Sequence, residues 1–175
     1  MKFTKGYWMN LPGVTNTDAV QVREVKVEND RVYLYTVPYH ADMRAMGGPL
    51  LEMYISSPQP DIIRTEAYHF MGSNQKMPAF ELNDAHCALE VENTETTVTI
   101  KSGNTKLVIG KNPCSFDYYY KDKKLTSIGN RFGNAMISTI STPDGNYMRA
   151  QMNLDIGEKV YGLGERFTPY VKNGQ

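Results

Sequence analysis

Hydrophobic residues of this chain alternate with polar ones in short runs, and this strand-like period constrains the fold more than any other feature. Turn residues interrupt the runs about every 8–12 residues, which is typical of antiparallel sandwiches and barrels. Residues 37–53 come closest to a helical pattern, but that segment is interrupted by Pro38, Gly47, Gly48 and Pro49. The expected strands are 20–22, 25–27, 31–37, 50–56, 61–70, 87–92, 96–101, 105–109, 115–121, 124–128, 135–142 and 147–155. The sequence therefore predicts an all-β, antiparallel fold with very little helix.

Two local patterns predict how these strands pair. Val20 and Val22 occupy even positions, whereas Val25 and Val27 occupy odd positions, so the two pairs would point to opposite faces of one regular strand. This switch predicts a β-bulge or a second buried face. The Pro-Asp-Gly-Asn turn at residues 143–146 lies between two strand-like runs. Such a turn predicts a β-hairpin.

Composition excludes several classes of function. The chain has 19 Lys+Arg and 19 Asp+Glu, a balance that argues against a nucleic-acid binder and against a polybasic membrane-surface protein. No apolar run is long enough to span a membrane, and the N-terminus lacks the apolar core of a signal peptide. Only Cys87 and Cys114 are present and there is no Asn-x-Ser/Thr sequon, so we expect a cytoplasmic protein. The three histidines lack zinc-ligand spacing, and no metal or cofactor is expected.

Motifs for catalysis are weak when they are taken alone. The Gly-Leu-Gly-Glu-Arg-Phe run at residues 162–167 lacks the third glycine of a dinucleotide-binding turn, and no βαβ unit surrounds it. There is no Gly-x-Ser-x-Gly elbow, and no pair among the many acids is selected by its spacing. Glu66 and His69 are three apart on an expected strand and would face opposite ways, so they are not expected to form an acid–base pair.

Tyrosines on the expected strands leave two interpretations open. They could form a sugar-stacking platform, or they could form ordinary cross-strand pairs, and the second interpretation is favoured. The tyrosines in question are Tyr33, Tyr35, Tyr118 and Tyr120.

A long motif near the C-terminus is more specific. Residues 157–168 read Gly-Glu-Lys-Val-Tyr-Gly-Leu-Gly-Glu-Arg-Phe-Thr, and Asn-Gly-Gln follows at 173–175. This tract resembles the end of the N-terminal domain of glycoside hydrolase family 31, and within it the α-xylosidase branch is the most similar. Gly-Tyr-Trp-Met at 6–9 and Leu-Pro-Gly-Val at 11–14 resemble the opening of the same enzymes. The resemblance covers the whole chain, more loosely through residues 79–146.

The resemblance implies a β-sandwich of the galactose-mutarotase-like kind, the supersandwich, over residues 1–160. Residues 161–175 would begin the loop that leads to a (β/α)8 barrel, the partner that carries both catalytic aspartates for retaining hydrolysis of α-linked oligosaccharides. No residue of this chain would be catalytic. Support of the substrate entrance or barrel interface is expected from Gly162, Gly164, Glu165, Arg166 and Phe167.

Further expectations concern partners and rival functions. The resemblance allows for a homo-oligomer, and no nucleic acid or membrane partner is expected. An apolar patch for the barrel is expected around Tyr161, Phe167 and Tyr170. The main alternative is a free-standing carbohydrate-binding β-sandwich module. A mutarotase-like enzyme is a third candidate, based on fold analogy alone.

Overall fold

The structure is a computed structural model that describes residues 3–5, 9–38, 50–69, 86–129, 137–164 and 167–173. These residues form fourteen strands and no helix. The first seven are β1 Thr4–Lys5, β2 Met9–Asn10, β3 Thr15–Asp18, β4 Gln21–Val27, β5 Arg31–Val37, β6 Leu51–Ser56 and β7 Arg64–Tyr68. The others are β8 Glu90–Asn93, β9 Thr97–Ser102, β10 Thr105–Lys111, β11 Cys114–Tyr120, β12 Lys123–Ile128, β13 Ile137–Thr142 and β14 Gly145–Ala150.

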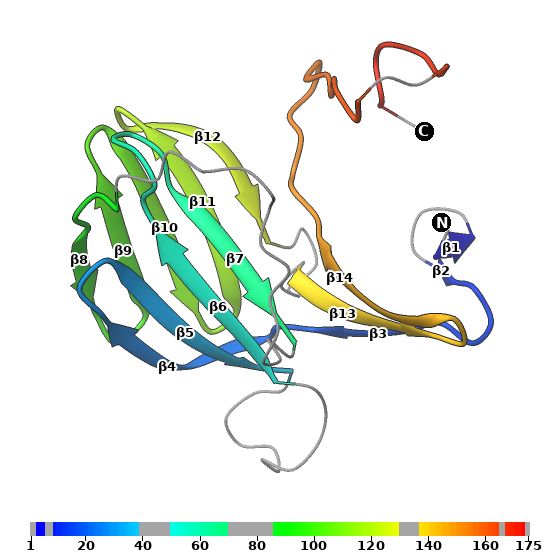
Figure 1. The fold of residues 1–175 in the computed structure, drawn as a ribbon, viewed down its shortest axis with the longest axis horizontal. Coiled ribbons are helices and arrows are strands. Elements are labelled where there is room, and N and C mark those ends of the chain that lie inside the picture. Colours follow the sequence, from blue (N-terminus) through cyan, green and yellow to red (C-terminus); the bar gives the residue numbers. More distant parts are fainter. Residues whose placement is uncertain are drawn as a thin grey trace.

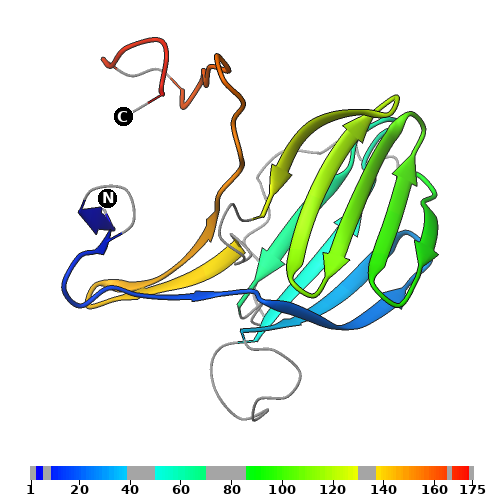
Figure 2. The same cartoon turned by 180° about the vertical axis from the view of Figure 1, so that it is seen from behind.

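Two antiparallel sheets form the main body (Figure 1). One has the strand order β4-β5-β6-β7, and the other has the order β12-β11-β10-β9-β8. Figure 2 shows the five-stranded sheet lying across the four-stranded one. The strands β14-β13-β3 form a smaller sheet that extends to one side, and β1 pairs with β2 beyond it (Figure 1). The expected antiparallel β-sandwich is confirmed.

Buried and more exposed side chains alternate along the strands, which explains why the two sheets pack together through one face each. Leu34, Met53 and Ile55 of the four-stranded sheet are completely buried, as are Ile100 and Leu107 of the five-stranded sheet. They belong to one continuous apolar cluster, to which both sheets contribute. Each such side chain contributes about 1.5–3 kcal/mol on burial, so the shared interior is the main source of stability.

Polar bridges also join the two sheets. The hydroxyls of Ser57 and Ser102 lie 2.7 Å apart in the interior. The hydroxyls of Thr65 on β7 and Tyr118 on β11 lie 2.9 Å apart. Because a buried hydroxyl without a partner is costly, these pairs allow polar residues to lie between the sheets.

The expected bulge and hairpin are both confirmed. The register of β4 against β5 shifts between Val22 and Glu24, where the apolar parity changes. Strands β13 and β14 pair from Ile137↔Ala150 to Thr142↔Gly145.

Several expected strands are shorter than the sequence suggests; the run 87–92, for example, is a strand only from Glu90. The run 147–155 ends as a strand at Ala150, because the following segment turns to the end of β12. There the Asn153 backbone N–H donates to Ser127 O at 2.8 Å. The run 61–70 becomes a strand only at Arg64, since Asp61 has a φ of 65°, which is incompatible with extended backbone.

Candidate functional site: a closed C-terminal loop and a hydroxyl-lined cleft

The C-terminal segment leaves the sandwich after β14 and runs away from both large sheets (Figure 1). Residues 151–164 are exposed and belong to no strand. Asn153 holds the beginning of this segment, since its side-chain amide donates to Ser127 Oγ at 2.8 Å and to Gly129 O at 3.0 Å. The beginning of the segment is therefore fixed to the sandwich at Asn153.

Hydrogen bonds then close this segment into a loop. The backbone N–H of Val160 donates to Asn173 Oδ1 at 2.8 Å, and the N–H of Lys172 donates to Val160 O at 2.8 Å. The Asn173 amide also donates to Glu158 O at 2.9 Å. We call the described residues 160–164 and 167–173 the C-terminal loop. A compact loop with adjoining ends is a common carrier of binding function.

Left-handed backbone shapes the first half of the C-terminal loop. Gly162 and Gly164 have φ values of 108° and 72°, a conformation that glycine adopts without steric cost. Leu163 between them has a φ of 68°. A left-handed conformation costs a residue with a Cβ about 1–2 kcal/mol, and this cost was not foreseen from the sequence.

Large apolar side chains of the loop face solvent. Phe167 is fully exposed, Tyr170 is 84% exposed and Leu163 is 67% exposed. Tyr161 is also exposed, and its ring centroid lies 5.5 Å from that of Tyr170. The three aromatic residues expected to form an apolar patch are thus all accessible, and Ile156 just before the loop is exposed as well.

The five residues predicted for the entrance or interface lie in one tract. Gly162, Gly164 and Phe167 belong to the C-terminal loop, whereas Glu165 and Arg166 lie outside the described residues. The sequence reasoning missed Asn173, whose side chain closes the loop. The only signal was the turn-forming Asn-Gly pair at 173–174, which does not indicate a partner thirteen residues upstream.

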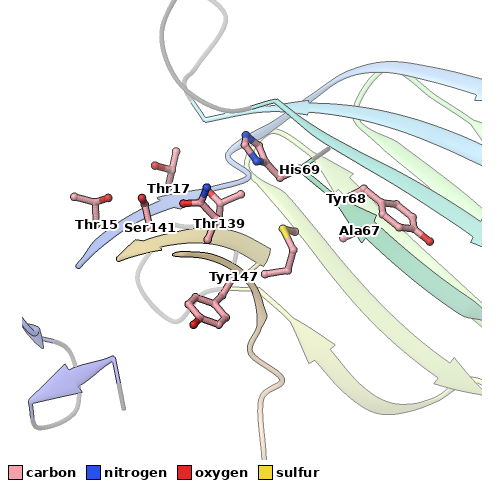
Figure 3. A pocket seen from close by; sticks show the side chains of 10 residues that line it. Thr15, Thr17, Ala67, Tyr68, His69, Thr139, Ser141 and Tyr147 are labelled. Atoms are coloured by element: carbon pink, nitrogen blue, oxygen red, sulfur yellow. The ribbon is translucent and has the colours of Figure 1, made fainter. Parts of the chain in front are cut away.

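A second feature is a cleft of about 650 Å³ between the small sheet and the end of β7. The small sheet lines it with two cross-strand rows of side chains, which are Thr17–Thr139–Met148 and Thr15–Ser141–Asn146. His69, directly after β7, lies on the other side of the cleft (Figure 3). We call these seven residues the hydroxyl cleft.

The opposite face of the small sheet carries the charges. Arg149 Nη2 lies 3.5 Å from Asp18 Oδ1, and Arg149 Nε donates to Ser138 Oγ at 3.1 Å. Tyr147 also points to this face, away from the threonines (Figure 3), and its ring centroid lies 5.2 Å from that of Phe3. The two faces of one sheet are thus chemically different.

Tyrosines do not form the single platform considered from the sequence. Tyr118 points between the sheets, toward Thr65, while Tyr120 ends β11 at a hairpin. Tyr33 instead begins a row on the outer face of the four-stranded sheet, with Tyr54 and then Tyr68 at centroid distances of 5.4 and 6.1 Å. The interplanar angles of 55° and 69° indicate a tilted contact and an edge contact between rings, in agreement with the favoured cross-strand interpretation.

Acidic residues complete this tyrosine row. The Tyr33 hydroxyl donates to Glu52 Oε1 at 3.0 Å, and the Tyr68 hydroxyl donates to Glu66 Oε1 at 3.0 Å. Burial is the main cause that raises the pKa of both phenols, and these hydrogen bonds raise it further. Glu66 thus serves the tyrosine row while His69 lines the cleft, and the two do not form an acid–base pair.

Metal and membrane signals are weak in the described part of the chain. No group of three or more His, Cys, Asp or Glu side chains is arranged there to hold a metal ion. Among the same residues, no helix is long and apolar enough to cross a membrane.

Two antiparallel sheets packed face to face define the chain as a β-sandwich domain. An uncharacterised protein from Listeria monocytogenes EGD-e has the same fold, with a TM-score of 0.71 and 18% identity, over 95% of this chain and 14% of that one. So does the cycloalternan-forming enzyme from Listeria monocytogenes in complex with a pentasaccharide substrate, with a TM-score of 0.70, 18% identity and the same two coverages.

Sequence comparison is more specific. Residues 52–175 match the glycosyl hydrolase 31 N-terminal galactose mutarotase-like domain, and the chain belongs to this family. It is 29% identical over its whole length to an α-xylosidase of Lactiplantibacillus pentosus, and 30% identical over its whole length to an α-xylosidase of Emericella nidulans. The chain spans 23% and 25% of the lengths of these two relatives.

Proposed function

We propose that this chain is the non-catalytic N-terminal domain of a retaining α-glycosidase that acts on α-xylosides or α-glucosides. Its role is to support a catalytic barrel and to shape the substrate entrance. The match to α-xylosidases over a quarter of their length supports a larger parent enzyme. The observation that carries the role is the C-terminal loop, which is closed by Asn173 and exposes Leu163, Phe167 and Tyr170.

Apolar exposure explains why this loop suits an interface. The fully exposed Phe167 and the largely exposed Tyr170 bury little surface against the sandwich. Burial of each against a second domain would contribute about 1.5–3 kcal/mol. The hydrogen bonds of Asn173 hold the loop ends together before contact, so less conformational entropy is lost on docking.

The test uses the full-length parent enzyme with p-nitrophenyl α-xyloside as substrate. Phe167→Ala and Tyr170→Ala are expected to lower kcat/KM by about tenfold or more, because a misplaced entrance loop weakens transition-state positioning. Val27→Ala is the matched control, since Val27 is an exposed apolar residue on the sandwich, at the end of β4. Hydrolysis by the 175-residue chain alone, or equal kcat/KM values for all three variants, would contradict the proposal.

The proposed compartment is the cytoplasm. Cys87 and Cys114 are both free thiols, as expected in a reducing environment. Trapping of thiols by alkylation in intact cells, followed by mass spectrometry, tests this; a mixed disulfide at either cysteine would contradict it.

A further inference from the structure

The hydroxyl cleft brings together strands that are far apart in the sequence. Register places Thr17 of β3 and Met148 of β14 on either side of Thr139 of β13, and it places Thr15 and Asn146 on either side of Ser141 in the next row. Side chains two apart on a strand point to the same face, so both rows face the cleft. Figure 3 shows the threonines on this face, with His69 opposite them.

The charged side chains of the small sheet itself lie on the face opposite the cleft. The residues of the two rows are neutral, and their hydroxyl and amide groups can both donate and accept hydrogen bonds. The nearest ion pair of the small sheet, Arg149 with Asp18, lies on its opposite face. A phosphate or carboxylate ligand would require a cation at the cleft, and the sheet does not supply one there.

Size and polarity together select a class of ligand. A volume of about 650 Å³ lies within the 300–1,000 Å³ of small-molecule sites. Met148 and Ala67 add apolar surface to the lining. A pyranose ring has this same combination, with hydroxyls at its edge and C–H groups on its faces.

We infer that the hydroxyl cleft binds a neutral saccharide. The rows on β3, β13 and β14 hydrogen-bond the sugar hydroxyls, Met148 contacts a C–H face, and His69 closes the opposite side. This inference goes beyond the proposed function, since the cleft is formed by this chain alone and needs no catalytic domain.

Titration of the isotope-labelled 175-residue chain, followed by amide chemical shifts, tests the inference. Xylose, methyl α-xyloside and maltose are the probes, and glucuronate is the charged comparison. We expect saturable shifts at β3, β13 and β14 with the neutral sugars, and a weaker response to glucuronate. Thr17→Val and Ser141→Ala each remove one hydroxyl and are expected to weaken binding about five- to tenfold.

Thr99→Val is the matched control, because Thr99 lies on β9, outside the cleft. It is expected to leave the affinity unchanged. Thr17→Val and Ser141→Ala act at different rows, so if one variant fails to fold the other still decides. The absence of saturable shifts with every neutral sugar would overturn the inference, as would equal affinities for the cleft variants and the control.

Discussion

Asn173 and Val160 hold the two ends of the C-terminal loop together, because the side-chain oxygen of Asn173 accepts the backbone N–H of Val160 at 2.8 Å. The Asn173 amide nitrogen donates to Glu158 O. One side chain therefore satisfies two backbone groups that no strand pairs. This makes the loop a separate unit whose order can be changed without altering the sandwich.

The first prediction concerns this closure. Asn173→Ala removes both hydrogen bonds, about 1–2 kcal/mol in total, and should speed hydrogen exchange at the Val160 amide by roughly tenfold. Asn173→Asp keeps the acceptor for Val160 and should give a smaller effect. Unfolding of the sandwich should not change in either variant. Asn93→Ala, an exposed asparagine at the end of β8, is the control, and unchanged exchange at Val160 in Asn173→Ala would refute the closure.

A second prediction concerns the contact between Gly103 and Asp61. Gly103 has a φ of 56°, and a Cβ there would clash with the Asp61 carboxylate. That carboxylate also accepts the Asn104 N–H. Gly103→Ala should therefore lower the free energy of unfolding in two ways, by about 1 kcal/mol for the strained backbone and by a similar amount for the steric clash. In an Asp61→Ala background only the backbone term should remain.

Urea unfolding measures this double-mutant cycle, with a shift of midpoint at constant m-value. Additive effects of Gly103→Ala and Asp61→Ala would show that the two residues do not interact.

Sequence reasoning succeeded where one strand carries its own signal. The run 31–37 alternates hydrophobic and polar residues and is β5, and the change of parity near Arg23 marks the bulge. In contrast, β3 spans Thr15–Asp18 and has no apolar residue at all. It is a strand because β13 pairs with it, and that pairing joins residues 120 or more positions apart.

The candidate sites show the same limit. The tract at 162–167 could be singled out by family resemblance, whereas the positive φ of its glycines and of Leu163 comes from the structure. The hydroxyl cleft could not be predicted, because each of its rows takes one side chain from each of three strands, and one of them, β3, is distant in sequence from the other two. Residues 151–155 alternate like a strand, but a strand needs a partner, and Asn153 bonds to β12 instead.

Alkaline pH should destabilise the chain through the tyrosine row. Burial is the main cause that raises the pKa of Tyr33 and of Tyr68. The hydrogen bonds to Glu52 and to Glu66, respectively, raise these pKa values further. The folded state therefore holds these protons more tightly than the unfolded state. This contribution is complete below the ordinary tyrosine pKa of about 10 and is lost as pH rises through it toward the folded values.

Urea midpoints measured between neutral pH and pH values above 10 test the tyrosine row. Tyr33→Phe and Glu52→Gln should both flatten the fall in stability, Tyr33→Phe more strongly because it removes the titrating group. A midpoint that is constant across this range, or a fall that Tyr33→Phe leaves unchanged, would contradict the prediction.

The two thiols should differ sharply in reactivity. Cys114 is 1% exposed between the sheets, and burial raises its pKa from 9.0 to about 12, which lowers its thiolate fraction about a thousandfold. Cys87 is half-buried and follows His86 outside any strand. A disulfide reagent at neutral pH should therefore label one thiol in the native chain and two in denaturant. In the Cys87→Ser variant, no thiol should be labelled until the chain unfolds. Rapid labelling of the native variant would mean that Cys114 is accessible.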